Sequence, residues 1–200
     1  MITTPLPPID LAGKQLILAS KSPRRRELLS GLGIPYVLET REVDESFPDH
    51  LVAGDIAMYL SGKKADAFLP HLRPGDIVIT ADTIVWINHH VLNKPESREE
   101  AFAMLGELSG NTHEVFTAVT IMSDHKRESF VDRTEVTFAE LTEKEINFYI
   151  DTYKPYDKAG AYGVQEFIGY MGITHLSGSY YNVMGLPVQK VYDCLKRWGG

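Results

Sequence analysis

The stretch QLILASKSPRRRELL, residues 15–29, joins a short apolar run to a polar turn that carries three successive arginines. Residues 15–19 have the length and apolar character of a buried strand. Ser22 and Pro23 then supply a helix N-cap residue and a proline suited to the first helical position, so we expect a helix over residues 24–32. The stretch therefore predicts a strand that leads directly into a helix.

The same alternation of strand and helix patterns continues along the chain. Ser97 with Glu100, and Thr142 with Glu145, have the spacing of capping boxes and predict two helix starts. Alternating strands and helices indicate an α/β fold, and the hairpin expected around residues 88–90 makes a mixed central β-sheet flanked by helices the predicted architecture. Further strands are expected at residues 36–39, 76–81, 84–87, 91–92, 114–122 and 134–139, and further helices at residues 51–68, 97–108, 142–152 and 187–197.

Length and composition predict one domain. The chain has 200 residues, of which 44% are hydrophobic and 24% charged, and this is enough to bury a core within the size range of a single domain. We therefore expect residues 1–200 to form one domain, with residues 1–13 as a loosely ordered, proline-rich N-terminal extension.

Charge and cysteine content bound the partners and the compartment. The net charge of -7 argues against a protein that holds nucleic acid through a broad basic face. No segment is apolar over the length of a bilayer, so we expect no membrane partner. Cys194 is the only cysteine, which excludes an intramolecular disulfide and fits a reducing cytoplasm.

A phosphate site is predicted at the junction of the first strand and helix. Free backbone N–H groups and the positive end of the helix dipole favour an anion there. The hydroxyls of Ser20 and Ser22 and the guanidinium groups of Arg24, Arg25 and Arg26 add donors suited to phosphate oxygens. The alternative is a capped helix with a solvated basic first turn, but positive charge is unfavourable beside a helix N-terminus unless an anion is present.

Asp82 and Thr83 form a second candidate site, expected at the C-terminal edge of the strand over residues 76–81. Asp82 could deprotonate a water or bind a divalent cation, and either role suits nucleotide hydrolysis. An aspartate at a strand end is also a common turn former. The pairs at residues 44–45 and 157–158 could converge on the same cleft or remain exposed loop charges.

Two lysines and one amide complete the candidate residues. Lys64 and Lys94 are candidates for phosphate contacts, although a solvated lysine is the commoner case. Gln165 ends the run GAYGVQ, in which small residues let a planar ligand approach the backbone while the amide reads a base edge. An incidental glutamine after a glycine-rich turn is an equal alternative. The seven histidines have no metal-binding spacing and receive no role.

Taken together, these motifs resemble the Maf family of nucleotide pyrophosphatases. The resemblance covers nearly everything from Leu16 to the last helix, with the motifs in the same order. The stretches that carry it are LASKSPRRRELL at residues 18–29, ITADTIV at 79–85, LNKP at 92–95, LSGNTHEVFTAV at 108–119, DKAGAYGVQ at 157–165 and GSYYNVMGLP at 178–187.

The resemblance implies a fold, an activity and a cofactor. The fold would be Maf-like, with two lobes around a central cleft, similar to inosine-triphosphate pyrophosphatase, and often assembled as a homodimer. The activity would be cleavage of a nucleoside triphosphate between the α and β phosphates with Mg²⁺ or Mn²⁺. Asp82 would be the proton acceptor, and we hypothesise that Glu45 and Asp82 bind the metal. We assign the phosphate contacts to Ser20, Ser22, Arg25, Lys64 and Lys94.

Within the family, Arg24, Thr83 and Gln165 match the specificity residues of the branch that acts on dTTP and UTP. The alternatives are a pyrophosphatase for 7-methyl-GTP or another modified purine, and a non-catalytic regulator of septum formation. One departure from the family pattern is Glu166 followed by Phe167, where relatives usually have glycine-rich sequence. We expect this departure to bear on the entrance to the base pocket.

Overall fold

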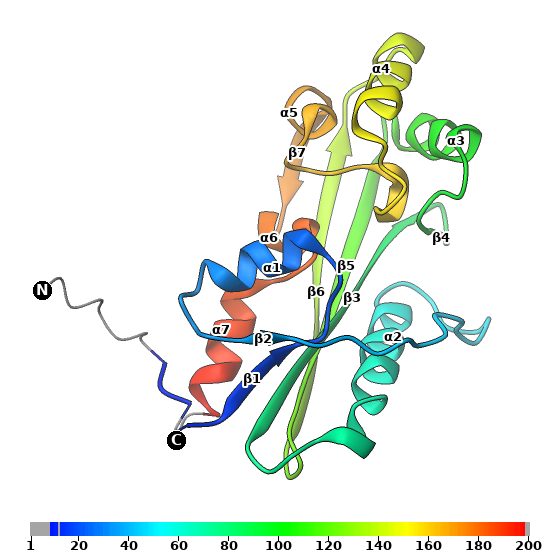
Figure 1. Ribbon diagram of the computed structural model, residues 1–200. Coiled ribbons are helices and arrows are strands. Elements are labelled where there is room, and N and C mark those ends of the chain that lie inside the picture. The colour runs from blue at the N-terminus through cyan, green and yellow to red at the C-terminus, as the bar shows by residue number, and fades with distance from the viewer. Residues whose placement is uncertain (1–8, 12, 199–200) are drawn as a thin grey trace, which may run out of the picture.

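A computed structural model describes residues 9–11 and 13–198 and contains a mixed seven-stranded sheet. The strand order is β2-β1-β3-β5-β6-β7, with β4 added to β3. β1 is parallel to β2 and β3, whereas the other pairings are antiparallel, which confirms the predicted mixed sheet (Figure 1). The strands are β1 (Gln15–Leu18), β2 (Val37–Leu38), β3 (Asp76–Ile87), β4 (His90–Leu92), β5 (Thr112–Met122), β6 (Arg127–Phe138) and β7 (Ile173–Ser177).

Helices cover both faces of the sheet and one of its ends. In Figure 1, α1, α6 and α7 lie on one side of the long strands and α2 on the other, while α3, α4 and α5 gather at the upper end. The α-helices are α1 (Pro23–Ser30), α2 (Gly54–Asp66), α3 (Arg98–Leu108), α4 (Glu143–Tyr153), α5 (Phe167–Gly172), α6 (Tyr180–Met184) and α7 (Val188–Lys196), and the 3₁₀ helices are η1 (Leu69–His71) and η2 (Ala159–Ala161).

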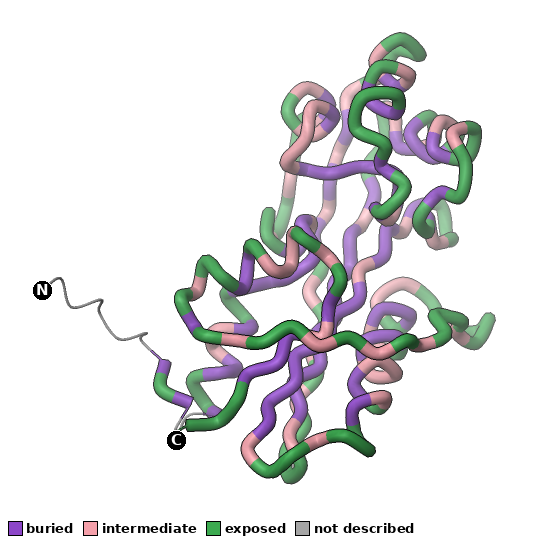
Figure 2. The backbone as a smooth tube through the Cα atoms, in the orientation of Figure 1, coloured by how far each residue is buried: buried purple, intermediate pink, exposed green. Residues whose placement is uncertain are grey.

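The central strand β3 is buried on both faces (Figure 2). Successive side chains of a strand point to opposite faces, and the two faces of β3 meet different parts of the core. Ile79 and Val85 belong to the main hydrophobic cluster, whereas Val78 and Ile84 pack in two smaller clusters with residues of α2. Even-numbered positions of β3 therefore face α2.

The expectation that a strand ends at Ala81 is wrong, because β3 runs through Asp82 and Thr83 without a break. Both residues pair with β5, Asp82 with Ala118 and Thr83 with Thr117. On the other edge of β3, pairing with β1 stops at Ile79 and pairing with β4 starts only at Val85. The polar pair thus marks an opening in the sheet and not the end of a strand.

Several local expectations also need correction. Thr142 and Glu145 form the complete capping box, but the carboxylate of Glu100 accepts the Glu96 N–H, so Ser97 caps α3 alone. Strand β7 and helices α5 and α6 were not anticipated. At the start of α6, Tyr180 is 40% and Tyr181 49% exposed.

The part of the expected N-terminal extension at residues 1–8 and 12 lies outside the described residues. In the described part of that segment, Ile9 and Leu11 are buried in the main hydrophobic cluster.

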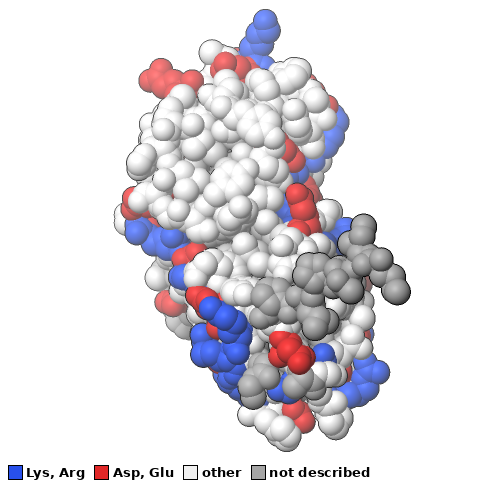
Figure 3. Space-filling model, turned by 90° about the vertical axis from the view of Figure 1, so that its left-hand side faces the viewer, with Lys and Arg blue, Asp and Glu red and all other residues white. Residues whose placement is uncertain are grey.

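None of the described helices combines the length and apolar character that crossing a bilayer requires. On the face drawn in Figure 3, the upper lobe is mostly uncharged and the charges of the lower half are of both signs.

Gly169 of α5 leads to a stability prediction. A Cβ at Gly169 would lie 2.0 Å from the carbonyl oxygen of Val164, which is backbone and has no rotamer to change. We expect Gly169→Ala to lower the free energy of unfolding by about 2 kcal/mol, the scale of an overpacked core. A Cβ at Gly106, inside α3, would have no other atom of the described residues within 4 Å. Gly106→Ala should therefore raise stability, by up to about 1 kcal/mol. Urea unfolding of both variants checks this, and equal effects would contradict it.

Candidate active site

One cavity of about 790 Å³ lies where the sheet opens between β1 and β4. This volume is typical of a small-molecule site. Its walls come from the start of α1, α2, the middle of β3, and the loops before α2, α3 and α5, so they combine segments far apart in the sequence. Of the residues that the sequence predicted for the site, Arg26 does not line the cavity. The others do, namely Ser20, Ser22, Arg24, Arg25, Glu45, Lys64, Asp82, Thr83, Lys94 and Gln165.

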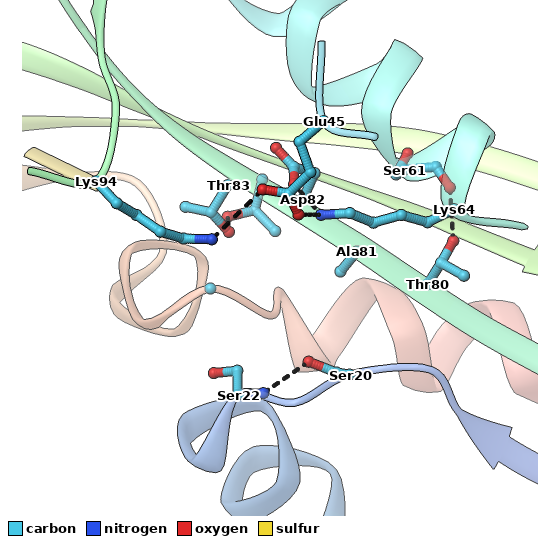
Figure 4. A network of polar contacts seen from close by, with 12 residues as sticks. Ser20, Ser22, Glu45, Ser61, Lys64, Thr80, Ala81, Asp82, Thr83 and Lys94 are labelled. Atoms are coloured by element: carbon cyan, nitrogen blue, oxygen red, sulfur yellow. Dashed lines mark hydrogen bonds and ion pairs between the residues drawn. The ribbon is translucent and has the colours of Figure 1, made fainter. Parts of the chain in front are cut away.

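Acidic and basic side chains meet on the α2 side of β3 (Figure 4). Asp82 is at an even-numbered position and therefore faces α2, where its Oδ1 lies 2.5 Å from the Nζ of Lys64. The same ammonium group lies 2.8 Å from Glu45 Oε1, and Lys94 Nζ lies 3.5 Å from Glu45 Oε2. The two carboxylates that were predicted as metal ligands thus share one lysine as counter-ion.

The pKa of Glu45 follows from this arrangement. Partial burial raises it, but the hydrogen bonds and charges of Lys64 and Lys94 outweigh burial and lower the pKa below the usual glutamate value. Glu45 is therefore a carboxylate at neutral pH. Asp82 is only 8% exposed, so its ion pair with Lys64 is partly withdrawn from water, where charge interactions are stronger.

The start of α1 keeps hydrogen-bond donors available. Ser22 caps the helix, accepting the Arg25 N–H at 3.4 Å, and Ser20 Oγ accepts the Ser22 N–H at 3.2 Å (Figure 4). Both hydroxyl oxygens act as acceptors in these bonds, so both O–H groups can still donate to a ligand. The first turn carries no acidic side chain that would neutralise the helix dipole and the arginines. This end of the cavity is suited to an anion.

Arg25 holds the opening of the sheet together. Its Nε donates to the Gly185 carbonyl at 2.7 Å, its Nη1 to the Ala81 carbonyl at 2.8 Å, and its Nη2 to Thr83 Oγ1 at 2.9 Å. A guanidinium group has five N–H donors, so two are left for a phosphate. Thr117 donates its hydroxyl proton to the Asn182 carbonyl, and the Thr83 hydroxyl must therefore donate to Thr117. The Thr83 hydroxyl is thus fixed in the floor of the cavity.

The opposite wall carries Gln165. Its Oε1 is buried without a hydrogen-bond partner among the residues that the structure describes, which is unusual for a buried amide oxygen. Arg24 reaches across the mouth of the cavity, where its Nη1 lies 2.9 Å from Asp157 Oδ2. Burial raises the pKa of Asp157, but bonds from Lys158 and Arg24 outweigh it and lower that pKa. Asp157 is thus an ionised link between two walls.

Sequence reasoning missed several lining residues. Tyr162 lines the cavity and is buried, and its hydroxyl lies 2.7 Å from His113 Nε2. Lys158 also lines the cavity and is buried, but it belongs to a pair that the sequence had already named as able to converge on the cleft. Phe68 also lines it, with the Arg41 guanidinium 5.3 Å above its ring. The DKAGAYG motif contains Tyr162 and could have drawn attention to it. Phe68 follows a helix in an ordinary apolar pattern and gave no signal.

The carboxylates of the cavity are the candidate ligands for a divalent metal. The described residues contain no group of three or more His, Cys, Asp or Glu side chains placed to hold a metal. Mg²⁺ commonly takes one or two carboxylates and completes its shell with water and substrate phosphates. Glu45 and Asp82 supply two carboxylates around one cation, the Lys64 ammonium, and thus fit such a metal.

The fold and the cavity define an α/β protein suited to binding a polyanionic ligand. A family model described as Maf-like protein matches residues 15–198, and the chain belongs to this family. A protein of Bacteroides thetaiotaomicron named dTTP/UTP pyrophosphatase is 54% identical over 184 residues, covering 92% of this chain and 95% of that protein. A protein of the same name from Phocaeicola vulgatus is 51% identical over 189 residues, covering 94% and 98%.

Among solved structures, the Staphylococcus aureus Ham1 protein has a TM-score of 0.41 and 14% identity over 64% of this chain and 73% of that chain.

Proposed function

We propose that this protein hydrolyses dTTP and UTP to the nucleoside monophosphate and pyrophosphate. The observation that carries the proposal is that Arg24, at the start of α1, and Asp82, in the middle of β3, line the same cavity. The proposal is supported by membership of the Maf-like family and by relatives named dTTP/UTP pyrophosphatase with 54% and 51% sequence identity.

The triphosphate is held by the cationic and hydroxyl groups of the cavity, and Asp82 activates a water against the α-phosphorus. Phosphoryl transfer requires mainly positioning and stabilisation of charge on the phosphoryl oxygens. Arg24, Lys64 and Lys94 supply positive charge, Arg25 offers its two remaining N–H donors, and Ser20 and Ser22 offer hydroxyl donors at the helix start.

We further propose that Glu45 and Asp82 would hold Mg²⁺ or Mn²⁺. Such a metal neutralises the polyphosphate charge and polarises its oxygens when bound. The Lys64 ammonium lies between the two carboxylates and compensates their charges. The position of this lysine supports the proposal that the carboxylates share a cation.

Base selectivity is assigned to Arg24, Thr83 and Gln165. The buried Oε1 of Gln165 supports this role, because an acceptor without a partner favours a base edge that donates. Uracil and thymine carry an N–H at position 3, whereas cytosine has an acceptor there. The amide oxygen therefore discriminates in favour of uracil and thymine nucleotides.

A panel of nucleoside triphosphates, with added Mg²⁺ or Mn²⁺ and scored for pyrophosphate release, tests the function. Wild-type protein should prefer dTTP and UTP, and Gln165→Ala should reduce that preference by about tenfold, the cost of a lost base hydrogen bond. Preference for 7-methyl-GTP would favour the modified-purine alternative, and no metal-dependent release would favour the non-catalytic one. An unchanged pyrimidine preference in the variant would remove Gln165 from base recognition.

The remaining proposals concern the context of the enzyme. We propose that residues 1–200 form one domain, that the protein acts in the cytoplasm, and that it forms a homodimer. The single, buried Cys194 supports a reducing compartment. The net charge of -7 supports the absence of a nucleic-acid partner.

A further inference from the structure

Glu166, one of two adjacent residues at which the resemblance implied a departure from the usual family sequence, does not line the cavity. Its side chain points instead into the wall that carries Gln165. Its Oε1 lies 3.1 Å from Lys158 Nζ, and its Oε2 accepts a hydrogen bond from the Tyr149 hydroxyl of α4. The carboxylate thus contacts Lys158 and Tyr149, which support this wall, and it does not face the entrance to the base pocket.

The contacts of Glu166 extend to both sides of the cavity. The Tyr149 hydroxyl accepts the Gly163 N–H at 3.0 Å, two residues before Gln165. Lys158 Nζ also lies 2.8 Å from Asp157 Oδ1, and the other oxygen of Asp157 pairs with Arg24. Glu166 therefore connects Arg24 with the loop that carries Gln165, and both of these residues are assigned to base selectivity.

These contacts lie in a closely packed environment. The side chains of Lys158 and Glu166 are 8% and 19% exposed, and Tyr149 is fully buried. A Cβ at Gly163 would lie 2.8 Å from Glu166 Cδ and 3.1 Å from Lys158 Cε, so these side chains pack directly on the loop backbone. Charge pairs in such surroundings are poorly screened by solvent, and removal of one partner leaves the other uncompensated.

We propose that Glu166 is a positioning residue that fixes the loop over residues 157–165 and thereby sets the affinity and base preference of the cavity. Without its charge, Lys158 retains Asp157 as its one anionic partner among the described residues, so Lys158 competes with Arg24 for that carboxylate. The Gly163 N–H loses the fixed Tyr149 hydroxyl, and Gln165 loses its defined position. This inference rests on the proposed function.

The test compares two identical substitutions, Glu166→Gln and Glu145→Gln. Glu145 lies on the same helix as Tyr149, accepts hydrogen bonds from Thr142 at the helix start, and does not line the cavity. Glu166→Gln should raise the KM for dTTP by about tenfold with kcat within about twofold, because binding is weakened in ground and transition states alike. It should also lower the ratio of pyrimidine to purine turnover. Glu145→Gln should change none of these.

Hydrogen exchange gives a readout that does not depend on activity. Amides in residues 157–166 should exchange faster in Glu166→Gln than in the wild type, and at the wild-type rate in Glu145→Gln. Tyr149→Phe keeps the ring but removes the bridging hydroxyl, so it should reproduce the KM rise if the Glu166 variant does not fold.

The outcomes separate the two claims. An active wild-type protein with the same KM, base preference and exchange in Glu166→Gln would overturn this inference alone. Wild-type protein that releases no pyrophosphate would overturn the proposed function, and the exchange comparison would then decide whether Glu166 fixes the loop.

Discussion

The Asp82→Asn variant is expected to lose on the order of 10³-fold in kcat, while KM for dTTP stays within about threefold. Asparagine fills the same volume but cannot accept a proton from water and is a poor metal ligand. The loss concerns steps that follow binding, because the triphosphate contacts of α1 remain. Steady-state kinetics with dTTP, together with binding of a non-hydrolysable analogue, measure the two effects separately.

Asp76→Asn is the matched control for this variant. Asp76 begins the same strand and is buried, but it pairs with Arg73 and does not line the cavity. It should therefore retain wild-type kcat. Equal activity in the two aspartate variants would remove Asp82 from the mechanism.

Lys64→Met is expected to lower kcat/KM by on the order of 10²-fold. The variant leaves Glu45 and Asp82 without their shared counter-ion and removes one positive charge from the triphosphate site. Lys63 is the adjacent residue on α2, but its ammonium group contacts Asp44 and the Ser46 carbonyl and it does not line the cavity. Lys63→Met should change kcat/KM less than about twofold. Comparable losses in both variants would mean that α2 contributes only general positive charge.

Much of the fold could be predicted because its signals are local. The N-cap hydroxyl of Ser22 followed by proline specifies the start of α1, and Thr142 with Glu145 specifies the start of α4. The continuity of β3 could not be predicted, because Asp82 and Thr83 have the local chemistry of a turn. Their strand conformation depends on β5, whose pairing residues lie more than thirty positions further along the chain.

The candidate site likewise has features that the sequence predicts and features that only the tertiary structure reveals. The types and order of its charged residues indicated that they would share one cavity, and the structure places them in one. The contacts of Arg25 could not be predicted, because its carbonyl partners belong to β3 and to the end of α6. The ion pair of Arg24 with Asp157 joins residues 133 positions apart, and no local pattern encodes it.

The loop around Glu166 illustrates a third case. The resemblance to the family implied a departure at this residue, and we expected an effect at the entrance to the base pocket. The Glu166 side chain is directed away from the cavity because it bonds to Tyr149 of α4, and Tyr149 also bonds to the backbone of the loop at Gly163. Side-chain direction of this kind follows from tertiary packing and cannot be read from spacing.

The most direct test of the account is hydrolysis of dTTP by the wild-type protein in ¹⁸O-labelled water with Mg²⁺, followed by ³¹P NMR of the products. Water activated by Asp82 against the α-phosphorus predicts dTMP and pyrophosphate, with the label in dTMP. Label in pyrophosphate, or release of orthophosphate with dTDP, would contradict the geometry proposed for the cavity.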